Sequence, residues 1–165
     1  MNEDVKISQK QRGMKWYNFI VKFQLWLIII AFFAYALLFL TGQMYDDAET
    51  AAKVYIIVPA MKTVDILYGI ISFACAACAF VIRKQLLNHE KNSPRNYIIF
   101  STCIILFPLF YDFAISICTN VSVFEIIGSD LLTLLIACIL NLICNTIYFY
   151  KRRYMFGAAG IRYKE

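Results

Sequence analysis

The chain has 165 residues, of which 61% are hydrophobic, with a mean hydropathy of +0.64 and a net charge of +5. Soluble domains are closer to half apolar because they carry a polar surface, so this composition argues against an ordinary soluble enzyme or binding domain. The apolar residues form four runs, about 16–41, 62–82, 97–119 and 128–150, each as long as the roughly 20 residues that cross a bilayer. Only helices and closed barrels satisfy the backbone in lipid, and these runs are too long for barrel strands. The sequence therefore predicts an all-α membrane protein, a four-transmembrane-helix bundle.

The distribution of charge predicts how this bundle is oriented. Of the 16 lysines and arginines, 14 fall in the tails (1–15 and 151–165), in the 83–96 connection, or near the matching ends of the spans. Because basic residues stay on the cytoplasmic side, both termini are predicted to be cytoplasmic in a multi-pass plasma-membrane protein. We expect the basic face to meet anionic lipid rather than nucleic acid.

The first run, which contains Gln24 near its inner end, is too long for a cleaved signal and is expected to remain as an anchor. The second run has small residues on one helical face, which is expected to pack inward. An extension of this span through residues 54–61 is left open. The predicted inward face holds Lys62, Asp65, Gly69, Ser72, Ala76 and Ala79.

Acidic residues of three spans form the main candidate site. Asp65, Asp112 and Asp130 are predicted to lie at a similar depth, roughly 22–28 Å from the inner ends at about 1.5 Å per helical residue. Lys62 can neutralise one of these carboxylates, most simply Asp65, which follows it by one helical turn. The cluster is interpreted either as a structural network or as a proton or cation site that opens outward, since ionisable groups inside a membrane are often functional.

Amide side chains lie nearer the inner side of the predicted bundle. Asn141 and Asn145 of the fourth span, together with Gln24 of the first, are candidates for interhelical polar contacts. They are predicted to fix helix packing rather than to bind a ligand.

Two other motifs are interpreted as structural. Cys75 and Cys78 form a C-x-x-C pair, but they lie well inside an apolar helix, where a thiol lacks the access that lowers its pKa. His89 is isolated in a polar connection, whereas a metal site needs several ligands at matched spacing. No catalytic residue, cofactor or metal is expected.

Three segments carry a resemblance to a known group of proteins. "KWYNFIVKF" at 15–23, "MKTVDILYG" at 61–69 and "NTIYFYKRRYMF" at 145–156 resemble segments of small four-span membrane proteins of low-GC Gram-positive bacteria, a group with no established function. The resemblance implies a bacterial membrane protein, with Asp65, Tyr68, Gly69 and Asn145 as positions of the family pattern.

These observations favour a non-enzymatic scaffold or accessory subunit that contacts the bilayer and either a membrane-protein partner or further copies of itself. The alternative is a small cation- or proton-coupled transporter or channel that uses the acidic cluster. An enzyme acting on lipid is a third, less supported hypothesis.

Overall fold

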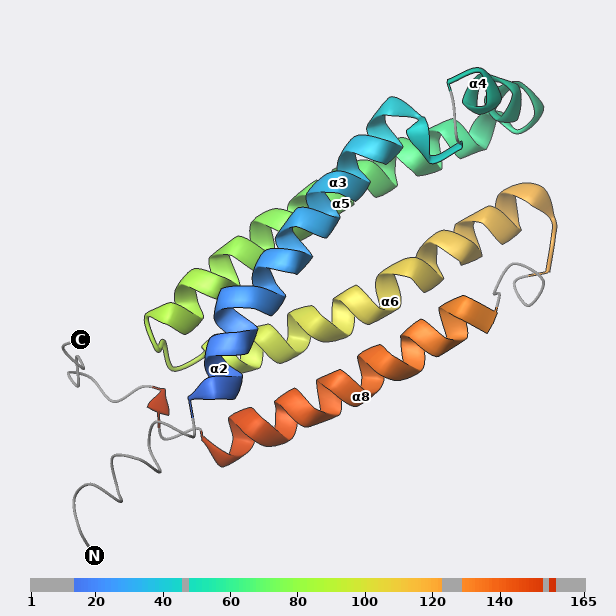
Figure 1. Ribbon diagram of the computed structural model, residues 1–165. Coiled ribbons are helices and arrows are strands. Elements are labelled where there is room, and N and C mark those ends of the chain that lie inside the picture. The colour runs from blue at the N-terminus through green and yellow to red at the C-terminus, as the bar shows by residue number, and fades with distance from the viewer. Residues whose placement is uncertain (1–13, 46–47, 123–128, 153–154, 157–165) are drawn as a thin grey trace, which may run out of the picture.

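The computed structural model describes residues 14–45, 48–122, 129–152 and 155–156, and for residues 48 and 129–131 it describes the backbone alone. Within these ranges all regular elements are helices, and four of the helices are long and apolar enough to cross a membrane, as predicted (Figure 1). The first of the four is continuous over Lys15–Thr41. The elements are α2 (Lys15–Phe19), the π-helical turn η1 (Ile20–Gln24), α3 (Leu25–Thr41), the 3₁₀ turn η2 (Gln43–Tyr45), α4 (Ala48–Ile57), α5 (Pro59–Leu87), α6 (Ser93–Thr119) and α8 (Ser129–Lys151).

Local chemistry accounts for most helix ends. Gly42 ends α3 with a φ of +74°, a left-handed conformation that glycine adopts without steric cost. Pro59 is the first residue of α5, and Val58 before it is extended, with φ −130° and ψ 81°. Residues 59–61 therefore extend the second span as part of α5, whereas residues 54–57 belong to α4, which is separated from α5 at Val58. Asn120 ends α6 in a left-handed conformation, with a φ of 57°.

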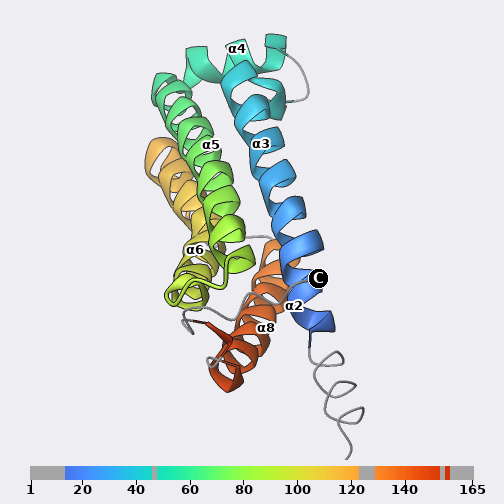
Figure 2. The same ribbon diagram turned by 90° about the vertical axis from the view of Figure 1, so that its left-hand side faces the viewer.

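The long helices run side by side, with α3 next to α5, α5 next to α6, and α6 next to α8 (Figure 1). The short helix α4 lies across one end of α3 and α5, which is called the α4 end below (Figure 2). The opposite end, called the terminal end, brings together residues from both extremes of the described chain. There the ring centroids of Phe156 and Tyr17 are 6.3 Å apart.

The predicted inward face of α5 is buried along most of its length. Asp65, Gly69, Ser72, Ala76 and Ala79 are all buried, whereas Lys62 is exposed. A closely packed contact lies at Gly69, where a Cβ atom would come 2.9 Å from Cγ of Leu40 on α3. Small residues on α5 thus allow α3 and α5 to approach closely, as expected for helices packed in lipid.

Most of the buried apolar side chains gather at the terminal end. They form a core between the first long helix, the last turns of α5, the first turns of α6 and the end of α8. Towards the α4 end α6 and α8 bury few of their side chains. The terminal core contains Tyr17, Ile20, Val21, Leu25, Ala79, Ile82, Leu86, Tyr97, Phe100, Phe149 and Phe156.

Candidate functional site

A buried carboxylate at the α4 end accepts hydrogen bonds from three tyrosines. Asp65 of α5 is 1% exposed. Its Oδ2 atom accepts hydrogen bonds from the hydroxyls of Tyr45, at 2.8 Å, and Tyr55, at 3.0 Å. Its Oδ1 atom accepts one from the hydroxyl of Tyr111, at 2.8 Å. The donors come from η2, α4 and α6, so one side chain connects three separate elements to α5.

This arrangement suits an ionised carboxylate, which is an acceptor only and is stabilised when hydroxyl groups donate to it. The same hydrogen bonds also change the pKa values of the two donor tyrosines that lie outside the long helices, Tyr55 and Tyr45. Burial and the hydrogen bond to Asp65 raise the pKa of Tyr55 to about 12. Burial, followed by the same interaction, raises the pKa of Tyr45 further. Both donors therefore keep their protons at neutral pH.

The connection between α3 and α5 places two of the three donors. The left-handed Gly42 turns the chain out of α3 and into η2, which ends at Tyr45. Pro59 separates α4 from α5, so that Tyr55 on α4 comes near Asp65 on the second turn of α5. The rings of Tyr45 and Tyr55 also meet edge to face, with centroids 5.8 Å apart.

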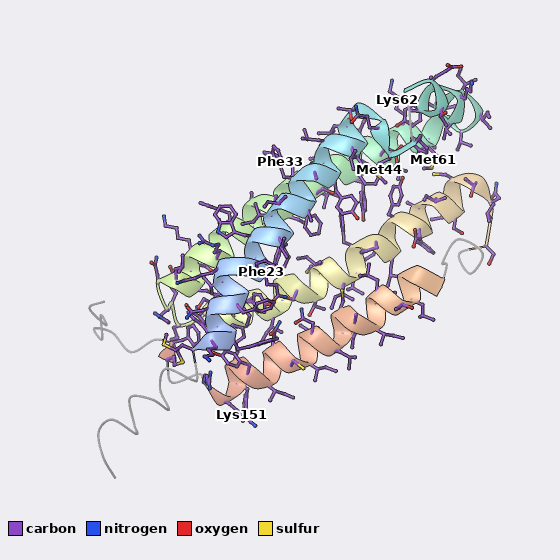
Figure 3. All side chains as sticks on the ribbon, viewed as in Figure 1. Phe23, Phe33, Met44, Met61, Lys62 and Lys151 are labelled. Carbon is purple, nitrogen blue, oxygen red and sulfur yellow. The ribbon has the colours of Figure 1, made fainter. Side chains whose placement is uncertain are left out.

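Lys62 does not pair with Asp65. Its side chain is exposed at the start of α5 (Figure 3). Within the described part of the chain the ion pair present is between Lys53 and Glu49 on α4, at 2.8 Å. The prediction that Lys62 neutralises Asp65 is therefore wrong, because tyrosine hydroxyls occupy the carboxylate oxygens.

The structure describes the side chains of two of the three predicted aspartates, Asp65 and Asp112. Asp112 of α6 is half-buried, and its Oδ2 atom is covered without a hydrogen-bond partner among the described residues. The side chain of Asp130 lies outside the described residues. No group of three histidine, cysteine or acidic side chains suited to a metal occurs in the described ranges.

Aromatic side chains fill the space on the core side of Asp65. The rings of Tyr68 and Phe107 stack with centroids 3.9 Å apart. The ring centroid of Phe39 lies 4.7 Å from that of Tyr68 and 5.0 Å from that of Tyr111. Tyr111 thus belongs both to this aromatic cluster and to the set of donors to Asp65.

A second polar network lies at the terminal end and is built on an amide. Asn145 of α8 is fully buried. Its Oδ1 atom accepts a hydrogen bond from the indole of Trp16, at 3.0 Å, and its Nδ2 atom donates to the hydroxyl of Tyr97, at 2.8 Å. Nδ2 also lies 3.1 Å from Oδ1 of Asn141, which is exposed one turn earlier on the same helix. The interhelical contacts of this pair are therefore made by Asn145.

Gln24 lies in the π-helical turn of the first long helix and is half-buried. Its Oε1 atom is buried and has no hydrogen-bond partner within the described ranges. In the same turn, the carbonyl of Val21 accepts a hydrogen bond from Nε of Arg83, at 3.0 Å. The guanidinium of Arg83 also lies over the ring of Trp26, 4.8 Å from its centroid. Arg83 thereby connects α5 to the first long helix at the terminal end.

Sequence reasoning missed the aromatic partners of both networks. Tyr45, Tyr55 and Tyr111 all fall near the predicted outer ends of the spans, at the level of Asp65. A buried carboxylate needs donors, and this clustering of tyrosines at its depth is the signal that could have identified them. Trp16 and Tyr97 stand at the starts of the first and third predicted spans, and nothing in their spacing pairs them with Asn145.

The sequence matches no protein-family model, and neither a curated protein nor a solved structure is significantly similar to it.

Proposed function

We propose that this chain is a four-span plasma-membrane protein with both termini in the cytoplasm, and that it serves as a non-enzymatic scaffold or accessory subunit. The basic residues near the terminal end support this orientation, because the cytoplasmic side of a membrane protein holds most of its lysine and arginine. We test it with reporters fused to the C-terminus. A fluorescent protein that matures in the cytoplasm should be bright there, and a phosphatase that requires export should be inactive. The reverse pattern would contradict the orientation.

The contacts of Asp65 are the observation that carries the structural role. Both of its oxygens accept hydrogen bonds from tyrosines, and those tyrosines belong to three other elements of the same chain. A transported cation or proton at Asp65 would compete with these donors, and losing them would loosen α4 and α6 from α5. Asp65 is buried deeply enough to be a candidate transport site, but its hydrogen bonds hold the bundle together instead.

The faces of α6 and α8 supply the surface for a partner. These two helices bury the smallest share of their apolar stretches among the four long helices of the described chain. On α8 the exposed residues include Asn141, whose amide can make a further hydrogen bond to a neighbouring helix in lipid. We therefore assign the interaction with a partner to the side of the bundle formed by α6 and α8.

A photo-crosslinking amino acid at Ile139 tests this assignment, and the same substitution at Ile30 of α3, which is more exposed than Ile139, is the control. Discrete protein adducts of one mass are expected from position 139 in intact cells, and lipid adducts alone from position 30. Lipid adducts alone at both positions would contradict the accessory role.

Asp112 supports a second candidate, a proton- or cation-coupled transporter. Its Oδ2 atom is covered and lacks a partner among the described residues, and Pro108 interrupts the hydrogen bonding of α6 one turn before it. Purified protein in liposomes that contain a pH-sensitive dye separates the two candidates. Proton or cation flux that is abolished by Asp112→Asn and retained in Asn141→Ala would favour the transporter. If the chain is a scaffold, neither the wild-type protein nor either variant should show flux.

A further inference from the structure

A cavity of about 210 Å³ opens at the α4 end of the molecule. Its walls come from the last turn of α3, from the middle of α4 and from the first turns of α5. Most of the wall is apolar, and the polar groups are two hydroxyls and one ammonium. The residues that define its character are Leu40, Thr41, Ala52, Tyr55, Lys62 and Ile66.

Lys62 is the charged residue of this cavity, and no carboxylate lines it. Asp65, one turn further along α5, is fully buried beneath its tyrosine donors. Glu49 on α4 is already paired with Lys53. The ammonium of Lys62 therefore has no acidic partner in the described part of the chain and can receive an anion from outside.

In the proposed membrane placement, the cavity lies at the level where lipid headgroups meet acyl chains. Thr41 is the last residue of α3, and Lys62 is the fourth residue of α5, so both mark the ends of their long apolar helices. Helix α4 lies across these ends (Figure 2) and exposes the side chains of Ile56 and Ile57, by 79% and 78%. A short helix with such exposed apolar residues is suited to lying in the interface of a bilayer.

We propose that this cavity binds one anionic phospholipid, with the phosphate at Lys62 and an acyl chain along Leu40 and Ile66. Tyr55 contributes to the wall and also donates to Asp65, so the bound lipid would stabilise α4 in its observed position. The site is at the opposite end of the described molecule from Arg83, Lys84 and Lys151 and is separate from the lipid contacts expected at the terminal end. It rests on the proposed placement in a membrane.

The test uses the full-length chain in nanodiscs of phosphatidylcholine that contain a small fraction of phosphatidylglycerol with the same acyl chains. Native mass spectrometry then measures the affinity of the most tightly bound phosphatidylglycerol after transfer to detergent. Lys62→Gln is expected to weaken this affinity about five-fold, the effect of one lysine near an anionic headgroup. Lys53→Gln is the matched control, because Lys53 is outside the cavity, and it should retain the affinity of the wild-type protein.

Ala52→Trp provides an independent variant that fills the cavity and keeps its charge. Ala52→Trp is expected to reduce retention of both phosphatidylcholine and phosphatidylglycerol. Lys62→Gln is expected to reduce retention of phosphatidylglycerol alone. Equal affinities for wild-type and Lys62→Gln protein, or equal losses from Lys62→Gln and Lys53→Gln, would overturn the proposal. A chain that does not enter nanodiscs at all would instead contradict the placement in a membrane.

Discussion

The two ends of the molecule solve the burial of a polar side chain in different ways. At the α4 end, Asp65 is an acceptor only and is surrounded by donors, the three tyrosine hydroxyls. At the terminal end, Asn145 accepts from Trp16 and donates to Tyr97. A carboxylate thus gathers partners of one kind, whereas an amide joins a donor to an acceptor. Because hydrogen bonds to charged groups are stronger, the α4 end should be more sensitive to loss of its central residue.

The largest effect is expected from Asp65→Leu, which leaves three tyrosine hydroxyls without their acceptor. Each hydrogen bond to a charged group contributes about 1.5–3 kcal/mol, and hydroxyls near the end of the helices can turn to water, so the free energy of unfolding should fall by about 3 kcal/mol. Unfolding in mixed detergent micelles measures the change. Asp112→Leu is the matched control and should cost less, because Oδ2 of Asp112 has no partner in the described chain. Equal losses would remove the special role of Asp65.

A smaller loss is expected from Asn145→Leu at the terminal end. The substitution removes hydrogen bonds to two other helices, each contributing roughly 0.6–1.7 kcal/mol in a membrane, so a loss of about 1–2 kcal/mol follows. Asn141→Leu should change stability less, because Asn141 is exposed and its contact is within α8. If Asn145→Leu were as damaging as Asp65→Leu in the same assay, charge would not be what distinguishes the two ends.

Between the two ends, Gly69→Ala tests the close contact of α3 with α5. The new Cβ atom would lie 2.9 Å from Cγ of Leu40 and 3.3 Å from Cβ of Phe39, so the helices must separate. Overpacking of this kind typically costs 1–3 kcal/mol, and we expect about 1–2 kcal/mol. Ser72→Ala, one turn away on the same buried face, should be close to neutral because its Oγ atom has no partner in the described ranges.

The smallest effect is a dependence on alkaline pH that belongs to the α4 end. The pKa of Tyr55 is raised from 10.0 to about 12 in the folded protein, so the unfolded chain loses this proton first as the pH rises. The stabilisation is therefore complete below pH 10 and is lost as the pH rises through about 12. Unfolding measured at a series of pH values should show a smaller loss in Tyr55→Phe than in the wild type. An unchanged pH profile would mean that burial and the hydrogen bond to Asp65 do not raise the pKa of Tyr55 in the folded protein.

The long helices and the buried face of α5 could be predicted because both follow from periodicity along one chain segment. Gly69, Ser72 and Ala76 repeat at helical spacing, so a single helix contains the whole signal. The pairing of Asp65 could not be predicted in this way. Spacing along α5 suggested Lys62, but two of the observed partners lie on a connection whose course depends on Gly42 and Pro59.

The hydrogen-bond partners that lie on the long helices could not be predicted from spacing along one segment either. Tyr111 adjoins Asp112 in the sequence, and consecutive residues point about 100° apart on a helix. A helical face that contains Asp112 therefore does not contain Tyr111. Asn145 was predicted as an interhelical contact, but the choice of Trp16 and Tyr97 depends on how three helices are rotated against one another. Rotation of that kind is a property of the packed bundle rather than of any one segment.

The π-helical turn at Ile20–Gln24 has a consequence for insertions and deletions in the gene. Tyr17, Val21 and Leu25 form a buried row spaced by four, with Ile20 buried beside it. The spacing is then about 3.5 from Phe32 through Ala36 to Phe39. The wide turn absorbs one surplus residue, so that both halves of the helix face the same interior. Removing one residue within 20–24 would restore ordinary winding without turning either half, whereas a deletion inside α3 would swing the preceding half by about 100°. The chain should accordingly tolerate a lost codon in this turn better than at other points of the first span.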